Sequence, residues 1–315
     1  MLPQITLVAF AANYTIKTPT MSNSSYFSAL PGVYEMGDGY AVIWATTFKG
    51  TGYIQYTYKG KTYTVYDEKN GIVRTGDTIH VVKVPHEHLQ GNSYTVYSKE
   101  VTSHNWANTN YGVTASCGPI TLKKYDGGTK DFDFLVLTDV HKLLDWAKNV
   151  SQKFKEPDLI VFSGDTVSKL NTKNDIVQLF NIMGSVSHGA NGQVPMVYIR
   201  GNHECRGPYS TTLLEYLPTK TGEYYFDFRY GPLYSVVLDT SEDKADQHWK
   251  TTHDRPRNEY GQLANFAEYH QRQEAWLRSL RKDDSATFRL GIYHIPRIHD
   301  LSRVSDTKQN LAQYT

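Results

Sequence analysis

Between residues 132 and 294, short apolar runs alternate with segments whose apolar residues recur every three or four positions. Strands are predicted at residues 132–138, 159–163, 196–199 and 288–293, with helices between them. A strand–helix–strand series folds into a sheet with parallel strands flanked by helices. A hairpin over residues 224–238, turning at Gly231 and Pro232, makes the predicted sheet mixed. The pattern therefore predicts an α/β domain.

Polar side chains follow four of these strands at the point where each strand ends. They are Asp139, Asp165, Asn202 with His203, and His294. In open α/β sheets the carboxyl ends of the strands form the ligand-binding edge, so these distant residues are expected to meet there. Carboxylate, imidazole and carboxamide groups suit ions such as zinc, manganese or iron. The sequence therefore predicts a metal site at this edge.

The motifs at these strand ends, taken in order, resemble those of the calcineurin-like metallophosphoesterase superfamily. They read Asp139-Val140-His141, Gly164-Asp165, Gly201-Asn202-His203-Glu204 and His294. Further segments resemble the purple acid phosphatase branch: Tyr225-Phe226-Asp227 before Gly231-Pro232, Leu238-Asp239-Thr240 and Gln273-Glu274-Ala275-Trp276-Leu277. The likeness implies a mixed β-sandwich flanked by helices.

The resemblance also implies a set of metal ligands. Asp139 and His141 match ligands of a first ion, Asp165 matches a bridging carboxylate, and Asn202 with His294 match ligands of a second ion. Two divalent or trivalent ions (Zn, Mn or Fe) are therefore expected as cofactors. Such a pair can polarise a phosphoryl group and lower the pKa of a bridging water. The implied reaction is hydrolysis of phosphate mono- or diesters by a metal-bridging hydroxide.

Residues beside the ligands receive supporting roles. His203 is expected to donate a proton to the leaving oxygen or to stabilise the transition state. Arg206 could clamp a phosphate oxygen of the substrate, although a solvated loop arginine is an equal alternative. Glu204 is expected to orient its loop rather than bind metal.

Structural alternatives exist for several of these residues. Asp139 and Asp165 could each cap a helix after a strand, and His294 could be a core histidine. Asp239 is expected to be a turn or hydrogen-bonding residue rather than a ligand. Histidines without a motif are predicted to be surface or packing residues: His80, His86, His88, His188, His248, His253 and His270.

Two departures separate the chain from the purple acid phosphatase branch and make its first metal site resemble that of non-purple members, and a third weakens the expected site. Purple acid phosphatases have an iron-ligating tyrosine where this chain has Ser168, and a glycine where it has His141. Purple colour is therefore not expected. The Gly-x-His-x-His-like segment that supplies one histidine to each ion is absent after His294, so we expect a domain truncated at its C-terminus, with weaker metal affinity and uncertain activity.

The N-terminal part has a different pattern, in which short alternating runs are separated by Gly, Asp and Asn. Strands are predicted at residues 40–44, 53–58, 62–66, 78–84, 94–100 and 120–124. His80-Val81-Val82 and Tyr94-Thr95-Val96-Tyr97 resemble a fibronectin type III-like domain. With 315 residues, two units that each bury a core are expected.

The predicted boundaries are an extension at 1–30, an all-β fibronectin type III-like sandwich at 31–125, a linker at 126–130 and the phosphoesterase domain at 131–315.

Composition restricts the partners. Lys plus Arg number 33 and Asp plus Glu 32, so no nucleic-acid surface is indicated, and no apolar run is long enough to span a membrane. Two cysteines are too few for a disulfide framework. The compartment stays open, with secretion slightly favoured: the N-terminus is apolar, and sequons at Asn13, Asn23 and Asn149 would permit glycosylation. Oligomeric state is not indicated.

Two other functions compete with phosphoester hydrolysis. A protein serine/threonine phosphatase would follow its bridging aspartate with Asp-Arg-Gly, whereas Asp165 is followed by Thr166-Val167-Ser168-Lys169. A non-catalytic binding or adhesion protein would use the sandwich and carry a degenerate phosphoesterase domain.

Overall fold

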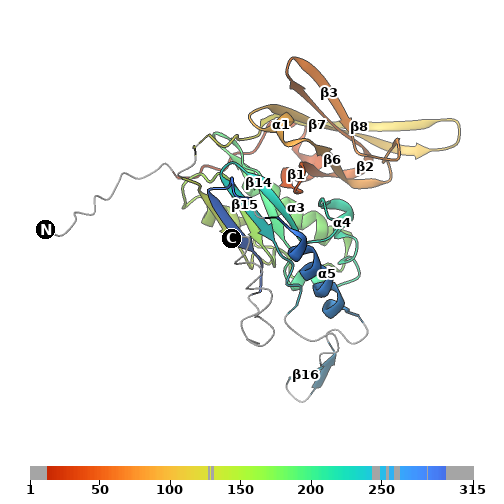
Figure 1. The fold of residues 1–315 in the computed structure, drawn as a ribbon. Coiled ribbons are helices and arrows are strands. Elements are labelled where there is room, and N and C mark those ends of the chain that lie inside the picture. The colour runs from red at the N-terminus through yellow and green to blue at the C-terminus, as the bar shows by residue number, and fades with distance from the viewer. Residues whose placement is uncertain are drawn as a thin grey trace.

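A computed structural model describes residues 13–126, 128, 131–242, 249–252, 255–258, 263–281 and 283–295. Among these residues a main sheet runs in the order β8-β7-β2-β1-β13-β10-β9, with β3 and β6 also paired to β2 (Figure 1). Its strands are β1 (Phe27–Glu35), β2 (Tyr40–Tyr58), β3 (Lys61–Tyr66), β6 (Asp77–Val84), β7 (Ser93–His104), β8 (Thr109–Thr121), β9 (Phe134–Leu137), β10 (Leu159–Ser163) and β13 (Met196–Ile199).

A second sheet stacks on the C-terminal part of the first. It consists of β14 (Phe226–Tyr230), β15 (Leu233–Val237) and β18 (Phe288–Ile292), with β14 antiparallel and β18 parallel to β15. Alternate residues of β10 and β13, such as Val161 and Val197, pack against Phe226, Phe228 and Val237 between the sheets. The predicted hairpin and the predicted mixed arrangement are confirmed.

Helices cover the outer faces of this sandwich. The main sheet carries α2 (Leu144–Ser151) and α3 (Lys173–Ser187), and the second sheet carries α5 (Phe266–Ser279), whose Leu277 packs on Val236. Asp175 in the first turn of α3 accepts the N–H of Thr172 at 2.8 Å, which satisfies one of the unpaired backbone donors at that end. The predicted helices therefore exist.

Short elements complete the described chain. They are η1 (Ser24–Tyr26), β4 (Glu68–Lys69), β5 (Ile72–Val73), α1 (His86–Leu89), β11 (His188–Gly189), β12 (Gly192–Gln193), η2 (His203–Cys205), α4 (Leu213–Tyr216), β16 (Trp249–Thr252) and β17 (Arg255–Asn258). None of the described helices is both long and apolar enough to cross a bilayer.

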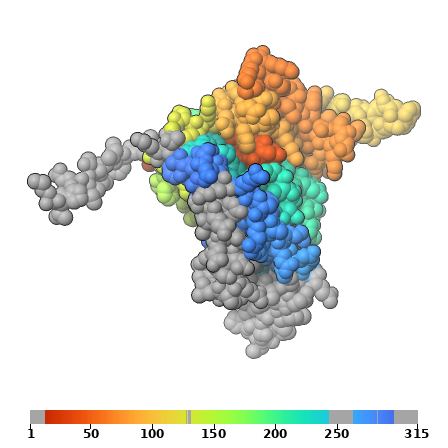
Figure 2. Space-filling view, viewed as in Figure 1, coloured from red at the N-terminus to blue at the C-terminus, as the bar shows by residue number. Residues whose placement is uncertain are grey.

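The N-terminal strands form a folded β layer around the long strand β2. The first part of β2 pairs with β1 and β6, and after a register shift between Ala45 and Gly50 its second part pairs with β7 and β3. Trp44, Ile54 and Val96 belong to the apolar cluster of this layer. The β7–β8 hairpin extends away from the body of the molecule (Figure 2). The likeness to a fibronectin type III domain stays a prediction.

Strand β1 joins the two halves, a connection that the sequence does not predict. It pairs with β2 on one edge and in parallel with β13 on the other, where Tyr34 lies opposite Met196. One apolar cluster contains residues of both halves, including Ile43, Val81 and Phe180. The N-terminal half also has an apolar cluster of its own, so the halves share one cluster in addition to their separate ones, because a common sheet carries its apolar face from one half into the other. The domain boundaries themselves stay a prediction.

The segment before β1 also packs on the C-terminal half, although the sequence assigns residues 1–30 to an extension. Tyr14 is buried and its hydroxyl donates to the carbonyl of Val186 at 2.7 Å. Strand β1 was missed because Pro31 and Gly32 interrupt its pattern and its pairing with β2 is irregular. The strand expected at 120–124 overlaps only the end of β8, which begins at Thr109 and ends at Thr121. Residues 1–12 and most of the linker lie outside the described residues.

His188 supports this junction as a neutral, buried side chain. Its Nε2 lies 2.9 Å from the carbonyl oxygen of Pro31, and burial lowers its pKa to about 4. Because the folded pKa lies below the unfolded value of about 6.5, His188 should make stability fall as the pH drops from 6.5 towards 4. We expect a loss of about 3 kcal/mol in urea unfolding from this group. His188→Gln should flatten that dependence; equal slopes in both proteins would contradict it.

Candidate metal centre

The predicted residues converge at the carboxyl ends of the stacked strands. Asp139 follows β9, Asp165 follows β10, Asn202 and His203 follow β13, and His294 follows β18 of the second sheet. Two groups of side chains each place one ligand atom per residue within 4.8 Å of one another. Asp165 belongs to both groups.

The first group is Asp139, Asp165 and His294. The Nε2 of His294 lies 3.4 Å from Oδ1 of Asp165. Its Nδ1 lies 2.7 Å from the carbonyl oxygen of Ser163 and donates to it, which fixes the orientation of the ring. A backbone acceptor behind a histidine is a common feature of metal-binding imidazoles.

The second group is His141, Asp165 and His203. The Nε2 of His203 lies 3.8 Å from Oδ2 of Asp165, and its Nδ1 donates to the carbonyl oxygen of Ser168 at 2.8 Å. The buried Nδ1 of His141 has no hydrogen-bond partner within the described residues. The two oxygens of Asp165 thus face different histidines, and a carboxylate can bind two cations through its two oxygens.

The backbone around these residues is strained. The φ angle is 55° at Asp139, 47° at His141 and 53° at Asp165, in the left-handed region that L-residues avoid. Such strain costs about 1 to 3 kcal/mol per residue and is concentrated at functional sites. The N–H of His141 donates to the carbonyl of Asp165 at 3.0 Å, so the two turns support one another.

The helix-cap alternative for the two aspartates is wrong. The residue preceding α2 is Leu143, and the residue preceding α3 is Thr172. Asp139 and Asp165 therefore do not cap these helices, and their conformations direct them to the strand edge instead.

Glu204 holds the loop, as the sequence predicts. Its buried carboxylate accepts the N–H groups of Asp165 and Gly201, each at 3.0 Å, and of Val167 at 2.9 Å. Burial raises its pKa to about 7, against the opposing effect of these donors. A Cβ at Gly201 would collide with Asp165, so only glycine allows this close approach.

The charge state of the centre favours a cation next to Asp165. Burial raises the pKa of Asp165, but hydrogen bonds from His294 and from the N–H of His203 outweigh this effect and lower it. Burial lowers the pKa of His294, but its contacts with Asp165 and the Ser163 carbonyl outweigh this effect and raise it. The Asp165 carboxylate thus stabilises positive charge at the position between Asp165 and His294. Carboxylate and imidazole donors at that position also fit a zinc, manganese or iron ion.

This geometry agrees with the comparison to known families. The calcineurin-like phosphoesterase family matches residues 132–310. The chain belongs to this family. Members are metal-dependent hydrolases of phosphoesters, and the match covers every residue predicted for the site. No curated protein matches the chain.

The remaining predicted residues, Asn202 and Arg206, lie at the same edge against a residue that sequence reasoning missed. The amide nitrogen of Asn202 lies 3.3 Å from Oε2 of Glu242, and Nη2 of Arg206 lies 3.0 Å from the same oxygen. Glu242 follows β15 of the second sheet. Its position after the strand-end segment Leu238-Asp239-Thr240 was the available signal.

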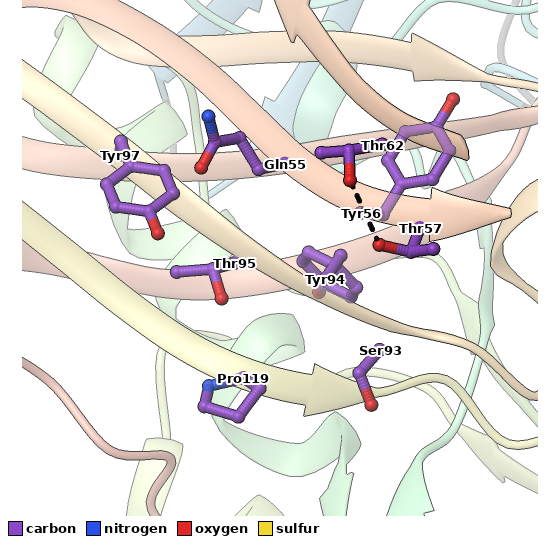
Figure 3. A pocket seen from close by; sticks show the side chains of 9 residues that line it. All are labelled: Gln55, Tyr56, Thr57, Thr62, Ser93, Tyr94, Thr95, Tyr97 and Pro119. Atoms are coloured by element: carbon purple, nitrogen blue, oxygen red, sulfur yellow. Dashed lines mark hydrogen bonds between the residues drawn. The ribbon is translucent and has the colours of Figure 1, made fainter. Parts of the chain in front are cut away.

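A depression in the N-terminal layer lies outside this centre (Figure 3). Hydroxyl groups around it pair across strands: Thr57 with Thr62 at 3.4 Å, and Ser93 with Thr121 at 2.7 Å. Its lining contains neither carboxylate nor imidazole: Gln55, Tyr56, Thr57, Thr62, Ser93, Tyr94, Thr95, Tyr97 and Pro119. These contacts are ordinary cross-strand pairing.

Glu204→Ala should destabilise the protein strongly, because three buried N–H groups would lose their acceptor. We expect a loss of about 3 to 5 kcal/mol in the free energy of unfolding, measured by urea denaturation. Glu204→Gln keeps one acceptor oxygen and should lose less. A loss below about 1 kcal/mol for Glu204→Ala would show that the loop does not depend on this carboxylate.

Proposed function

We propose that this family member hydrolyses phosphate mono- or diesters at a centre of two metal ions bridged by Asp165. The observation that carries the proposal is that Asp165 belongs to both groups of potential ligand atoms, with its Oδ1 facing His294 and its Oδ2 facing His203. When bound, the ions would neutralise phosphate charge and activate water at near-neutral pH. Phosphoryl transfer then needs mainly positioning and electrostatic stabilisation from the protein.

The proposed ligands follow the order of the motifs. By the family motifs, Asp139 and His141 would hold the first ion with Asp165, and Asn202 and His294 would hold the second with Asp165. The structure instead groups Asp139 with His294 and His141 with His203. The motif assignment is supported by the 3.8 Å between Nε2 of His141 and Oδ1 of Asp139. Zinc, manganese and iron all suit these donors, and purple colour is not expected. The purple acid phosphatase-like likeness and a secreted location remain proposals of the sequence.

His203 is proposed as the proton donor to the leaving oxygen. Its Nδ1 is held by the carbonyl of Ser168, which directs Nε2 towards Asp165 and the centre. Arg206 places Nη1 3.2 Å from that Nε2, close enough to bind a phosphate oxygen at the same place. The grouping of His203 with His141 supports a rival role as a metal ligand, which mutation can distinguish.

Asp165→Asn should reduce the content of both ions together and abolish hydrolysis of an aryl phosphate. The measurement is elemental analysis per chain beside a turnover assay. Asp158→Asn is the matched control, because Asp158 pairs with Lys123 at 3.2 Å and contacts no candidate ligand. Loss of only one ion per chain from Asp165→Asn would contradict a bridging role. Metal-free wild-type protein without hydrolysis would favour the non-catalytic alternative.

His203→Ala should leave the metal content near normal while lowering turnover by about 10² to 10⁴, the usual scale for a general acid. His104→Ala, in the exposed β7–β8 hairpin, is the control and should change neither quantity. Loss of metal from His203→Ala would make His203 a ligand and remove its proposed role as proton donor.

A further inference from the structure

We infer that Glu242 is a positioning residue, which orients the Asn202 amide and the Arg206 guanidinium for the proposed centre through one buried carboxylate oxygen. This inference rests on the proposed function, because Asn202 is taken as a ligand and Arg206 as a phosphate-binding group. Glu242 comes from the second sheet, whereas both of its partners follow β13 of the main sheet. It therefore connects the two layers at the site.

The contact with Asn202 fixes which atom of the amide can bind metal. An ionised carboxylate only accepts hydrogen bonds, so the atom facing Oε2 of Glu242 at 3.3 Å must be the amide nitrogen. The amide oxygen, which alone can ligate a cation, is thereby turned away from Glu242. The flipped orientation would present N–H groups to the ion, and these cannot ligate a cation.

The contact between Glu242 and Arg206 fixes the position of the positively charged guanidinium. Nη2 of Arg206 lies 3.0 Å from the same Oε2, while Nη1 lies 3.2 Å from Nε2 of His203. The Glu242 side chain is completely buried, and an ion pair with one buried partner is less screened than a surface pair. Glu242 therefore holds the guanidinium beside the proposed proton donor.

A strained turn delivers Glu242 to this position. Ser241 has a φ of 48°, and its N–H donates to Oδ1 of Asp239 at 2.8 Å. Arg200 pairs with Asp239 at 2.5 Å and donates to the Ser241 hydroxyl at 3.0 Å. Tyr269 of α5 donates to Asp239 at 2.9 Å. Several contacts thus hold a costly conformation whose next residue points into the site, as expected where strain serves function.

A purely structural ion pair would have a different signature. Removing it would lower the stability of the protein. The effect of its removal on metal binding would not depend on which atoms the side chain at position 202 carries. A positioning role predicts that the effect of Glu242 on metal binding depends on the asymmetry of the amide. Asn202→Asp removes that asymmetry, because both terminal atoms of the new side chain are oxygens.

The test is a double-mutant cycle read out by metal affinity. Purified chains carrying Glu242→Gln, Asn202→Asp or both are titrated with Zn²⁺, and circular dichroism checks that each is folded. Glu242→Gln should lower the affinity for the second ion by about 10- to 100-fold, the usual scale for a residue behind a ligand. In the Asn202→Asp background, Glu242→Gln should lower the Zn²⁺ affinity little or should raise it. The reason is that Glu242→Gln then removes the repulsion between two neighbouring carboxylates, at positions 202 and 242.

Asp77→Asn is the structural control. Asp77 accepts the hydroxyl of Tyr216 at 2.8 Å and pairs with Lys173, so it links the two halves without touching a candidate ligand. Its loss should lower stability and leave Zn²⁺ affinity unchanged. The inference would be overturned if Glu242→Gln lowered the Zn²⁺ affinity equally in the wild-type and Asn202→Asp backgrounds, or in neither. Failure of the wild type to bind Zn²⁺ would instead overturn the proposed function.

Discussion

The conformation of Asp165 is the constraint on which the rest of the site depends. Its backbone adopts a positive φ directly after a buried strand, and its N–H is held by Glu204 from the β13 loop. Its carbonyl supports His141, and Oδ1 accepts the N–H of His203 at 2.9 Å. Asp165 thus fixes the three strand-end loops relative to one another before any metal binds. The cost of the strained turn is offset by these buried hydrogen bonds.

The N-terminal and C-terminal halves of the molecule are joined by one continuous sheet. Because β1 lies between β2 and β13, the N-terminal layer continues the sheet that carries the centre. Helix α3 packs on the same continuous face, with Gly184 close to the backbone of Leu30. The N-terminal layer is therefore part of the support of the phosphoesterase unit. Changes at the junction, such as at His188, are expected to affect the stability of the whole molecule.

The second sheet does more than close the apolar core. His294 and Glu242 both follow its strands, and the Asp239 turn is locked by Arg200 from the main sheet and by α5. Interactions across the sandwich therefore set the side-chain orientations at the site. A buried acceptor behind a ligand and a buried anion behind an arginine reduce the number of conformations that the site can adopt.

The sequence by itself determined the C-terminal α/β pattern, the hairpin and the residues that gather at the strand ends. It could do so because the hydrophobic period reports secondary structure, and parallel strands present their carboxyl ends at one edge. Glu204 was also predictable, since it lies within the same motif as Asn202.

Only the tertiary structure decided the rest. The place of β1 could not be inferred, because Pro31 and Gly32 obscure its pattern and pairing with β13 depends on residues about 160 positions away. The position of Glu242 after a strand end was visible in the sequence, but its partnership with Asn202 and Arg206 was not, since that contact arises only when two sheets stack. Local periodicity encodes the strands and their ends, whereas contacts between layers depend on how the whole chain packs.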